Sequence, residues 1–175
     1  MIPHEEIFNK NGGSTFRKCQ IICHENHEDN GGTLRYRSHI QNADYLAIAE
    51  RTDTNIHEVV GYVGLRFKNN KWAVSQVATD PQYQGCGIGT ALYDYVLQHL
   101  KGIDKLHVHV AQDNVASLAL HDRFGFTEYH DDKPTIAFQR IVGPEAIYTM
   151  DEAIPQEYQV RHPIQKIRQD AEMGI

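Results

Sequence analysis

The chain has 175 residues, of which 41% are hydrophobic and 23% charged, and this composition is typical of one folded domain. A formal net charge of −6 argues against a general nucleic-acid binder. The three cysteines (Cys19, Cys23 and Cys86) form no CxxC pair, as in proteins of reducing compartments. The first residues show no secretion-signal pattern, and no apolar run reaches the roughly 18 residues of a membrane span. We therefore expect a cytoplasmic protein that binds neither nucleic acid nor a membrane.

The first half of the chain reads as a series of strands. The predicted strands cover residues 16–25, 44–52, 58–67 and 72–79, and the sequence KNNK supplies a hairpin turn between the last two. Short turns between successive strands favour an antiparallel meander.

After residue 79 the apolar spacing changes from that of a strand to that of a helix. Apolar residues from Ile88 onward predict an amphipathic helix that ends near residues 101–102. A strand follows at 105–111, and then a short helix within 113–126, for which Asn114 is a suitable N-cap. This order places a strand–loop–helix–strand–helix unit in the middle of an α/β mixed sheet.

The end of the chain is predicted less sharply. Strands are expected at 126–131 and 146–154, and the long connection 133–146 between them carries apolar residues that either pack on the sheet, line a pocket or contact a second copy in a homodimer. Those residues are Ile136, Phe138, Ile141 and Val142. We expect residues 1–154 to form the domain and residues 155–175 to form a tail with helical character.

Residues 76–92, QVATDPQYQGCGIGTAL, place three glycines in five positions between a strand and a helix. Glycine lets a backbone approach an anion closely, and a helix start offers unpaired N–H groups, so this arrangement predicts a phosphate-binding loop. A P-loop would need Lys-Ser/Thr after the glycines, and a dinucleotide loop would need G-x-G-x-x-G. Neither pattern is present.

The segment Gln84-Gly85-Cys86-Gly87-Ile88-Gly89 resembles Q/R-x-x-G-x-G/A, the pyrophosphate loop of the GNAT superfamily of N-acetyltransferases. The segment DNVASLALHDRFGF (113–126) resembles that family's second motif, and VVGYVGL resembles the strand before the loop. Together the resemblance covers roughly residues 58–130. It implies a GNAT-type fold, acetyl-CoA as the co-substrate without a metal, and an amine of a small molecule or peptide as the acceptor.

The resemblance also implies which residues hold the donor. The backbone of the strand end pairs with the pantetheine arm, the loop N–H groups hold the pyrophosphate, and a polar stripe on the second helix faces the CoA. These residues are Val77, Ala78, Thr79, Gln84, Gly85, Cys86, Gly87, Ile88, Gly89, Thr90, Asn114 and Ser117. Cys86 is interpreted as a small loop residue.

His121 stands where many members of the family carry the tyrosine that protonates the departing thiolate. A histidine with the ordinary pKa of about 6.5 is mostly neutral at pH 7, so an acid role would need a nearby carboxylate. Otherwise His121 acts as a hydrogen-bond donor and not as a full acid, or it only contacts the cofactor and the thiolate leaves unassisted.

His109 lies five residues before Asn114, where some family members that acetylate protein N-termini carry a glutamate base. His109 is therefore a candidate general base, and the alternative is a hydrated strand histidine without a role. A zinc site formed by His107, His109 and His130 is a further alternative, although the three lack a regular ligand spacing.

The acceptor remains open from the sequence alone. Glu25, Glu28 and Asp29 could attract a cationic amine or simply line a solvated loop. The sequence predicts an N-acetyltransferase that works by direct attack of the amine. The alternatives are a non-catalytic acyl-CoA-binding sensor domain, acyl transfer to a hydroxyl, and use of a longer acyl chain.

Overall fold

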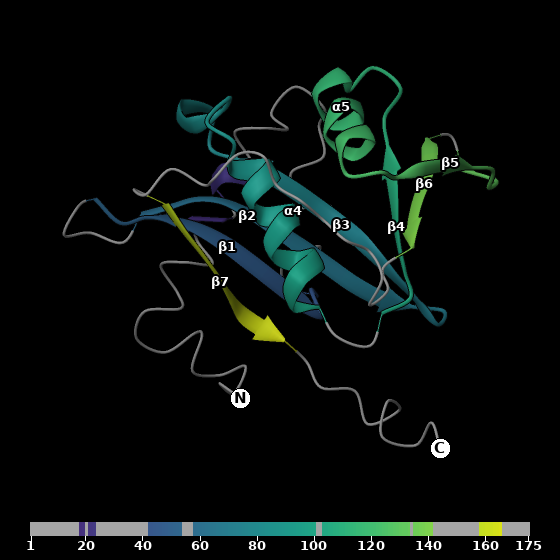
Figure 1. The fold of residues 1–175 in the computed structure, drawn as a ribbon, viewed down its shortest axis with the longest axis horizontal. Helices are drawn as coiled ribbons and strands as arrows, with labels where there is room; N and C mark the ends of the chain where they lie inside the picture. The colour runs from purple at the N-terminus through teal and green to yellow at the C-terminus, as the bar shows by residue number, and fades with distance from the viewer. Residues whose placement is uncertain are drawn as a thin grey trace.

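The computed structural model describes residues 18–19, 21–23, 42–53, 58–100, 103–133, 135–141 and 158–165. Within these ranges seven strands form one sheet in the order β5-β6-β4-β3-β2-β1-β7 (Figure 1). β3 and β4 pair in parallel and every other neighbouring pair is antiparallel, which confirms the predicted mixed sheet. The strands are β1 (Tyr45–Arg51), β2 (Glu58–Lys68), β3 (Lys71–Thr79), β4 (Lys105–Val110), β5 (Thr127–Tyr129), β6 (Ile136–Ile141) and β7 (Tyr158–Gln165).

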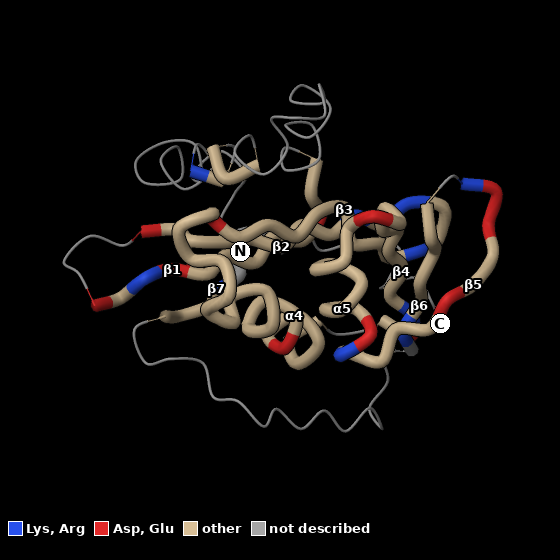
Figure 2. Tube along the Cα trace, turned by 90° about the horizontal axis from the view of Figure 1, so that it is seen from above, with Lys and Arg blue, Asp and Glu red and all other residues tan. Residues whose placement is uncertain are grey.

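Helices cover both faces of this sheet. The 3-10 helix η2 (Pro81–Tyr83) and helix α4 (Ile88–His99) follow β3, and helix α5 (Val115–Arg123) follows β4. Figure 2 shows α4 and α5 on one side of the sheet and the helical residues 18–19 and 21–23 on the other. Among the described helices, none combines the length and the apolar character that crossing a membrane requires.

The meander β1–β2–β3 forms as predicted. Asn69 and Asn70 link β2 to β3 with φ angles of 52° and 60°. Two successive residues with positive φ make the type I′ turn, whose twist matches that of a hairpin, and asparagine tolerates this conformation better than most residues. The sequence KNNK therefore fixes the pairing of Lys68 with Lys71.

The main core lies between the sheet and the helices α4 and α5. Leu92, Tyr93 and Val96 of α4 are fully buried in the same cluster as Val63 of β2 and Leu106 of β4. Because the apolar residues of α4 recur at helical spacing, one face of the helix meets the sheet while the other remains in solvent.

Residues 16–25 were predicted as a strand, and this prediction is wrong for the described residues, which are helical at 18, 19 and 21–23. Cys19, Ile22 and Cys23 are buried together against Tyr62 in a second core on the opposite face of the sheet. Their i, i+3, i+4 spacing is that of one helix face. The strand was predicted from the residue types of this segment, which is rich in isoleucine and cysteine, and not from the helical spacing of its buried residues.

Helix was also expected in the C-terminal tail, but residues 158–165 form strand β7 against β1. Partial burial of Tyr158 and Val160 against the main core shows the two-residue period of a strand. Pro163 is tolerated because β7 is at the edge of the described sheet, and the pairing with β1 shifts register between Leu46 and Ile48.

The segment after β5 also differs from the prediction. Residues 136–141, expected within a long connection, form β6, which pairs with both β5 and β4. Phe138 packs against the main core, which agrees with the first of the expected alternatives, packing on the sheet. The predicted strand 146–154 and Val142 lie outside the described residues.

Candidate functional site

The two parallel strands in the middle of the sheet separate along their length. Within the described residues β3 and β4 pair only through Trp72 with Leu106 and Ala73 with His107. β3 continues beside β2 as far as Thr79, whereas β4 turns toward β6 (Figure 1). The strands therefore open into a wedge whose β3 side includes the predicted pantetheine-binding residues 77–79.

A β-bulge in β3 accompanies this opening. Gly64 of β2 pairs with Gln76 and the next residue, Leu65, pairs with Val74, so Ser75 is the extra residue. The Ser75 hydroxyl donates to the Gly64 carbonyl at 2.9 Å. A bulge bends its strand and increases the twist, which favours the departure of β3 from β4.

The glycine-rich loop lies at the wide end of the wedge and leads into α4. Gly85 and Gly87 both have φ of +79°, and Gly87 is the N-cap of α4 without a side-chain cap. A Cβ at either position would meet no atom of the described residues within 4 Å, so within the chain itself the positive φ angle, and not crowding, favours glycine there. The first helical bond of α4 is donated by the Ala91 N–H to the Gly87 carbonyl, so the N–H groups of the first helical turn, at residues 88–90, have no partner within the helix and are available to an anion.

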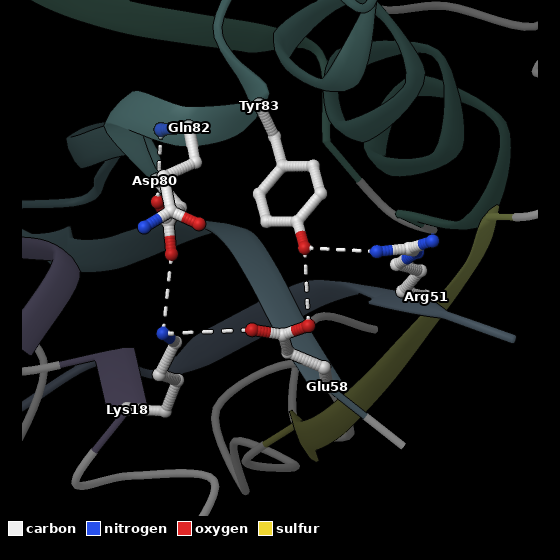
Figure 3. Close-up of polar contacts among 6 residues, drawn as sticks. All are labelled: Lys18, Arg51, Glu58, Asp80, Gln82 and Tyr83. Atoms are coloured by element: carbon white, nitrogen blue, oxygen red, sulfur yellow. Dashed lines mark hydrogen bonds and ion pairs between the residues drawn. The ribbon is translucent and has the colours of Figure 1, made fainter. Parts of the chain in front are cut away.

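Asp80 fixes the turn that precedes this loop. Its buried carboxylate accepts from the Gln82 N–H at 3.0 Å, and its other oxygen lies 3.1 Å from the Lys18 ammonium (Figure 3). Lys18 also approaches Glu58 at 3.9 Å. The sequence analysis did not identify Asp80, although an aspartate before proline is a common capping signal.

Tyr83 ties the same turn to the neighbouring strands. Its hydroxyl donates to Glu58 Oε2 at 3.1 Å and accepts from Arg51 at 3.2 Å (Figure 3). The ring also makes an edge contact with Tyr158 of β7. The loop is therefore held to β1, β2 and β7 by side chains distant in sequence.

Gly61 of β2 lets α4 approach the sheet. A Cβ there would lie 2.7 Å from Ile88 Cγ2 and 3.1 Å from the Ala78 carbonyl oxygen. Any other residue would therefore push away the first turn of α4. The sequence gives no direct signal for this role, because it depends on a contact across the sheet.

Helix α5 begins at the predicted N-cap. The Asn114 side chain accepts from the Ser117 N–H at 3.1 Å, and Gly125 after the helix has φ of +72°. The Asn114 side chain thus caps the helix, and whether it also contacts CoA stays a prediction.

His121 of α5 is buried and both of its ring nitrogens are engaged. Nδ1 lies 2.6 Å from the Ser117 carbonyl oxygen and Nε2 lies 2.5 Å from the Tyr93 hydroxyl. A carbonyl only accepts, so Nδ1 carries the proton and Nε2 accepts from Tyr93. Burial lowers the pKa of His121, which favours this neutral form.

Aromatic rings surround this histidine. Phe126 and Tyr93 contact the imidazole edge-on with centroids 5.0 and 5.1 Å away, and Phe138 stacks at 6.4 Å. The described residues place no carboxylate in hydrogen-bond contact with His121. The arrangement suits a residue that holds α5 to α4, and the sequence analysis did not identify Tyr93 as its partner.

His107 and His109 share the face of β4 that points away from α4. Leu106, Val108 and Val110 fill the main core, so alternation directs the two histidines to the opposite face. His107 is buried beside the ring of Tyr129, and its Nδ1 has no hydrogen-bond partner among the described residues. Burial, and secondarily nearby lysines, lower its pKa.

His109 contacts Asp131, which follows β5, through Nε2 and a carboxylate oxygen. The hydrogen bond from His109 lowers the pKa of Asp131. Among the described residues no group of three histidine, cysteine or acidic side chains is arranged to hold a metal. The zinc alternative at His107, His109 and His130 thus gains no support from this part of the chain. Glu25, Glu28 and Asp29 lie outside the described residues.

Comparisons with known proteins agree with this geometry. The model of the acetyltransferase (GNAT) family matches residues 14–126. A mycothiol acetyltransferase from Geodermatophilus obscurus is 42% identical over 55 residues, which cover 30% of this chain and 18% of that protein. The ribosomal protein bS18-alanine N-acetyltransferase of Escherichia coli K12 is 37% identical over 54 residues, 30% of this chain and 36% of that protein. The matches thus span well under half of either relative.

Solved structures share the fold. PH1933 from Pyrococcus horikoshii superposes with a TM-score of 0.61 and 20% identity over 76% of this chain and 94% of its own. The E. coli ribosomal-protein-S18-alanine N-acetyltransferase gives a TM-score of 0.57 and 20% identity over 78% of this chain and 94% of its own.

Proposed function

The chain belongs to the acetyltransferase (GNAT) family, and we propose that it transfers an acetyl group from acetyl-CoA to a primary amine of a small molecule or peptide. The amine nitrogen attacks the thioester carbonyl, the carbon–sulfur bond breaks, and the amine loses one proton while the thiolate gains one. No covalent acyl-enzyme is needed, since a deprotonated and positioned amine is itself nucleophilic.

The observation that carries the proposal is the wedge between β3 and β4 that ends at the glycine loop. Among the described residues, the edge of β3 beyond Ala73 is not paired with β4, so its backbone at Val77 and Ala78 can pair with an extended ligand, and the start of α4 offers N–H groups to a pyrophosphate. Both suit acetyl-CoA, a ligand with a long amide-containing arm and an anionic end. Its thioester supplies the activated acyl group when bound.

On the acceptor side we keep His109 as the candidate base. It lies on β4 two residues beyond the last pair with β3, so it borders the open part of the wedge. His121 as the acid is supported less well, because its one proton is directed at the Ser117 carbonyl. Unchanged turnover in His121→Phe would contradict the acid role.

The first test is thiol release from acetyl-CoA by the purified chain with a panel of acceptors. The panel contains polyamines, amino acids, aminoglycosides, and peptides that include one beginning with alanine, since one relative is named for alanine acetylation. Release above the rate without acceptor supports the proposal and identifies the acceptor class. Absence of release with every acceptor contradicts it.

A second candidate function is a non-catalytic acyl-CoA-binding domain. The observation in its favour is that both ring nitrogens of His121 are occupied where relatives are expected to carry an acid. Calorimetric binding of acetyl-CoA without turnover on the whole panel would favour this candidate.

A further inference from the structure

His109 and Asp131 form a pair that spans two elements of the sheet. His109 comes from β4, and Asp131 comes two residues after the end of β5. Their side chains are 23% and 24% exposed, so the pair is accessible to solvent. Because β6 lies between β4 and β5, the sheet itself brings the two residues together.

The carboxylate is held in place before any substrate arrives. Asp131 Oδ1 accepts from the Lys133 N–H at 3.1 Å, and Oδ2 contacts His109 Nε2. One oxygen is thus anchored by the backbone and the other is directed at the imidazole. Such an arrangement restricts the orientation of both planar groups.

The contact also determines which nitrogen of His109 can accept a proton. A carboxylate only accepts, so Nε2 carries the hydrogen in the bond to Asp131. In the neutral ring Nδ1 then has a free lone pair, and within the described part of the chain it makes no hydrogen bond. A general base needs such an unoccupied nitrogen close to its substrate.

We propose that Asp131 is a positioning residue that fixes the Nε2–H tautomer of His109, so that Nδ1 accepts the proton of the acceptor's ammonium group. The ammonium N–H bond breaks, its electron pair stays on the amine nitrogen, and the proton forms a bond to Nδ1. Nε2–H remains bonded to Asp131, and the proton then passes from Nδ1 to solvent. This inference rests on the proposed acetyl transfer.

The variant Asp131→Asn tests the inference, with Asp132→Asn as the matched control in the same loop. The assay is thiol release with the most active acceptor of the panel. We expect Asp131→Asn to lower kcat about tenfold, which is less than the roughly hundredfold loss typical of removing a base, with KM for acetyl-CoA unchanged. Asp131→Glu should recover part of the loss, and Asp132→Asn should match the wild type.

A solution measurement separates positioning from a merely structural ion pair. An exposed ion pair changes stability by less than about 1 kcal/mol, so the melting temperature should hardly change in Asp131→Asn. In ¹⁵N–¹H spectra of the imidazole groups at pH 8, the resonance that is absent from His109→Gln is assigned to His109. This resonance should show the Nε2–H tautomer in the wild type and a mixture of both tautomers in Asp131→Asn.

The outcomes distinguish the inference from the function on which it rests. If the wild type is active and Asp131→Asn has the same kcat, the role of Asp131 is overturned and the proposed function is not. An Nδ1–H tautomer of His109 in the wild type has the same consequence. Absence of wild-type turnover with every acceptor overturns the proposed function and the catalytic step with it.

Discussion

The glycine loop and the β4–β5 region approach the same wedge with different chemistry. The loop between β3 and α4 presents main-chain N–H groups, and its geometry depends on two glycines with φ of +79°. The β4–β5 region presents side chains, among them His109 and Asp131. The proposed role of the first region therefore depends on backbone conformation, and that of the second depends on functional side chains.

This difference predicts how each region responds to substitution. The Cys86 side chain of the loop is exposed, and exchanging it should matter little. A change in backbone conformation there should remove binding. His109 lies in the regular ladder between β4 and β6, so an isosteric change of its side chain should affect turnover and leave the fold intact.

The largest effect is expected from His109→Gln, which removes the candidate base and keeps a polar side chain of similar size. We expect kcat to fall about a hundredfold, the lower end for loss of general-base catalysis, with acetyl-CoA affinity unchanged. Steady-state thiol release and calorimetric titration measure the two quantities. His130→Gln, at an exposed histidine of the loop that carries Asp131, is the control, and an equal loss of kcat in both variants would contradict the role of His109.

Gly87→Val should produce the next largest effect, now on binding. Valine is disfavoured at φ of +79° by about 1–3 kcal/mol, so the loop would change conformation and acetyl-CoA affinity should fall about tenfold to a hundredfold. Gly125→Val imposes similar strain at φ of +72°, outside the loop. Calorimetry should show weakened acetyl-CoA binding only in Gly87→Val. Equal affinities in the two variants would contradict a role of the loop in binding acetyl-CoA.

The sequence predicted the loop more completely than the β4–β5 region for a physical reason. A strand, three glycines and a helix form a local pattern, and the positive φ angles at Gly85 and Gly87 follow from residues that are neighbours in the chain. The Asn114 cap and the Asn69–Asn70 turn were equally local and were confirmed. Most of the central fold could be inferred in this way.

The features that were missed depend on contacts between distant segments. Asp131 meets His109 only because β6 inserts between β4 and β5, and the sequence analysis had not recognised β6. Tyr93 becomes the partner of His121 only when α4 and α5 pack on one face. Single-sequence patterns do not encode such pairs, so the proposed proton-transfer residues were less predictable than the proposed donor loop.

The burial of His121 predicts a pH dependence of stability. Its pKa is lowered from the ordinary 6.5, so below about pH 6.5 the unfolded chain binds a proton that the folded chain does not. The free energy of unfolding should therefore decrease as pH falls below 6.5, by at most about 1.4 kcal/mol per pH unit for one proton. Urea unfolding of His121→Gln, which does not titrate, should give a shallower slope. An unchanged slope would assign the dependence to other groups, such as His107.

Tyr83→Phe should have the smallest effect and tests how firmly the loop is attached to the sheet. The variant keeps the ring on Tyr158 and removes the hydroxyl that joins Glu58 to Arg51. Loss of a partly buried hydrogen bond should lower the free energy of unfolding by about 0.5–1.5 kcal/mol in urea titrations. If these bonds also position the loop, acetyl-CoA affinity should fall two- to threefold. Tyr129→Phe, in the β4–β5 region, should leave that affinity unchanged. A wild-type affinity in Tyr83→Phe would mean that the glycine φ angles and the Asp80 cap are sufficient to hold the donor loop without this link.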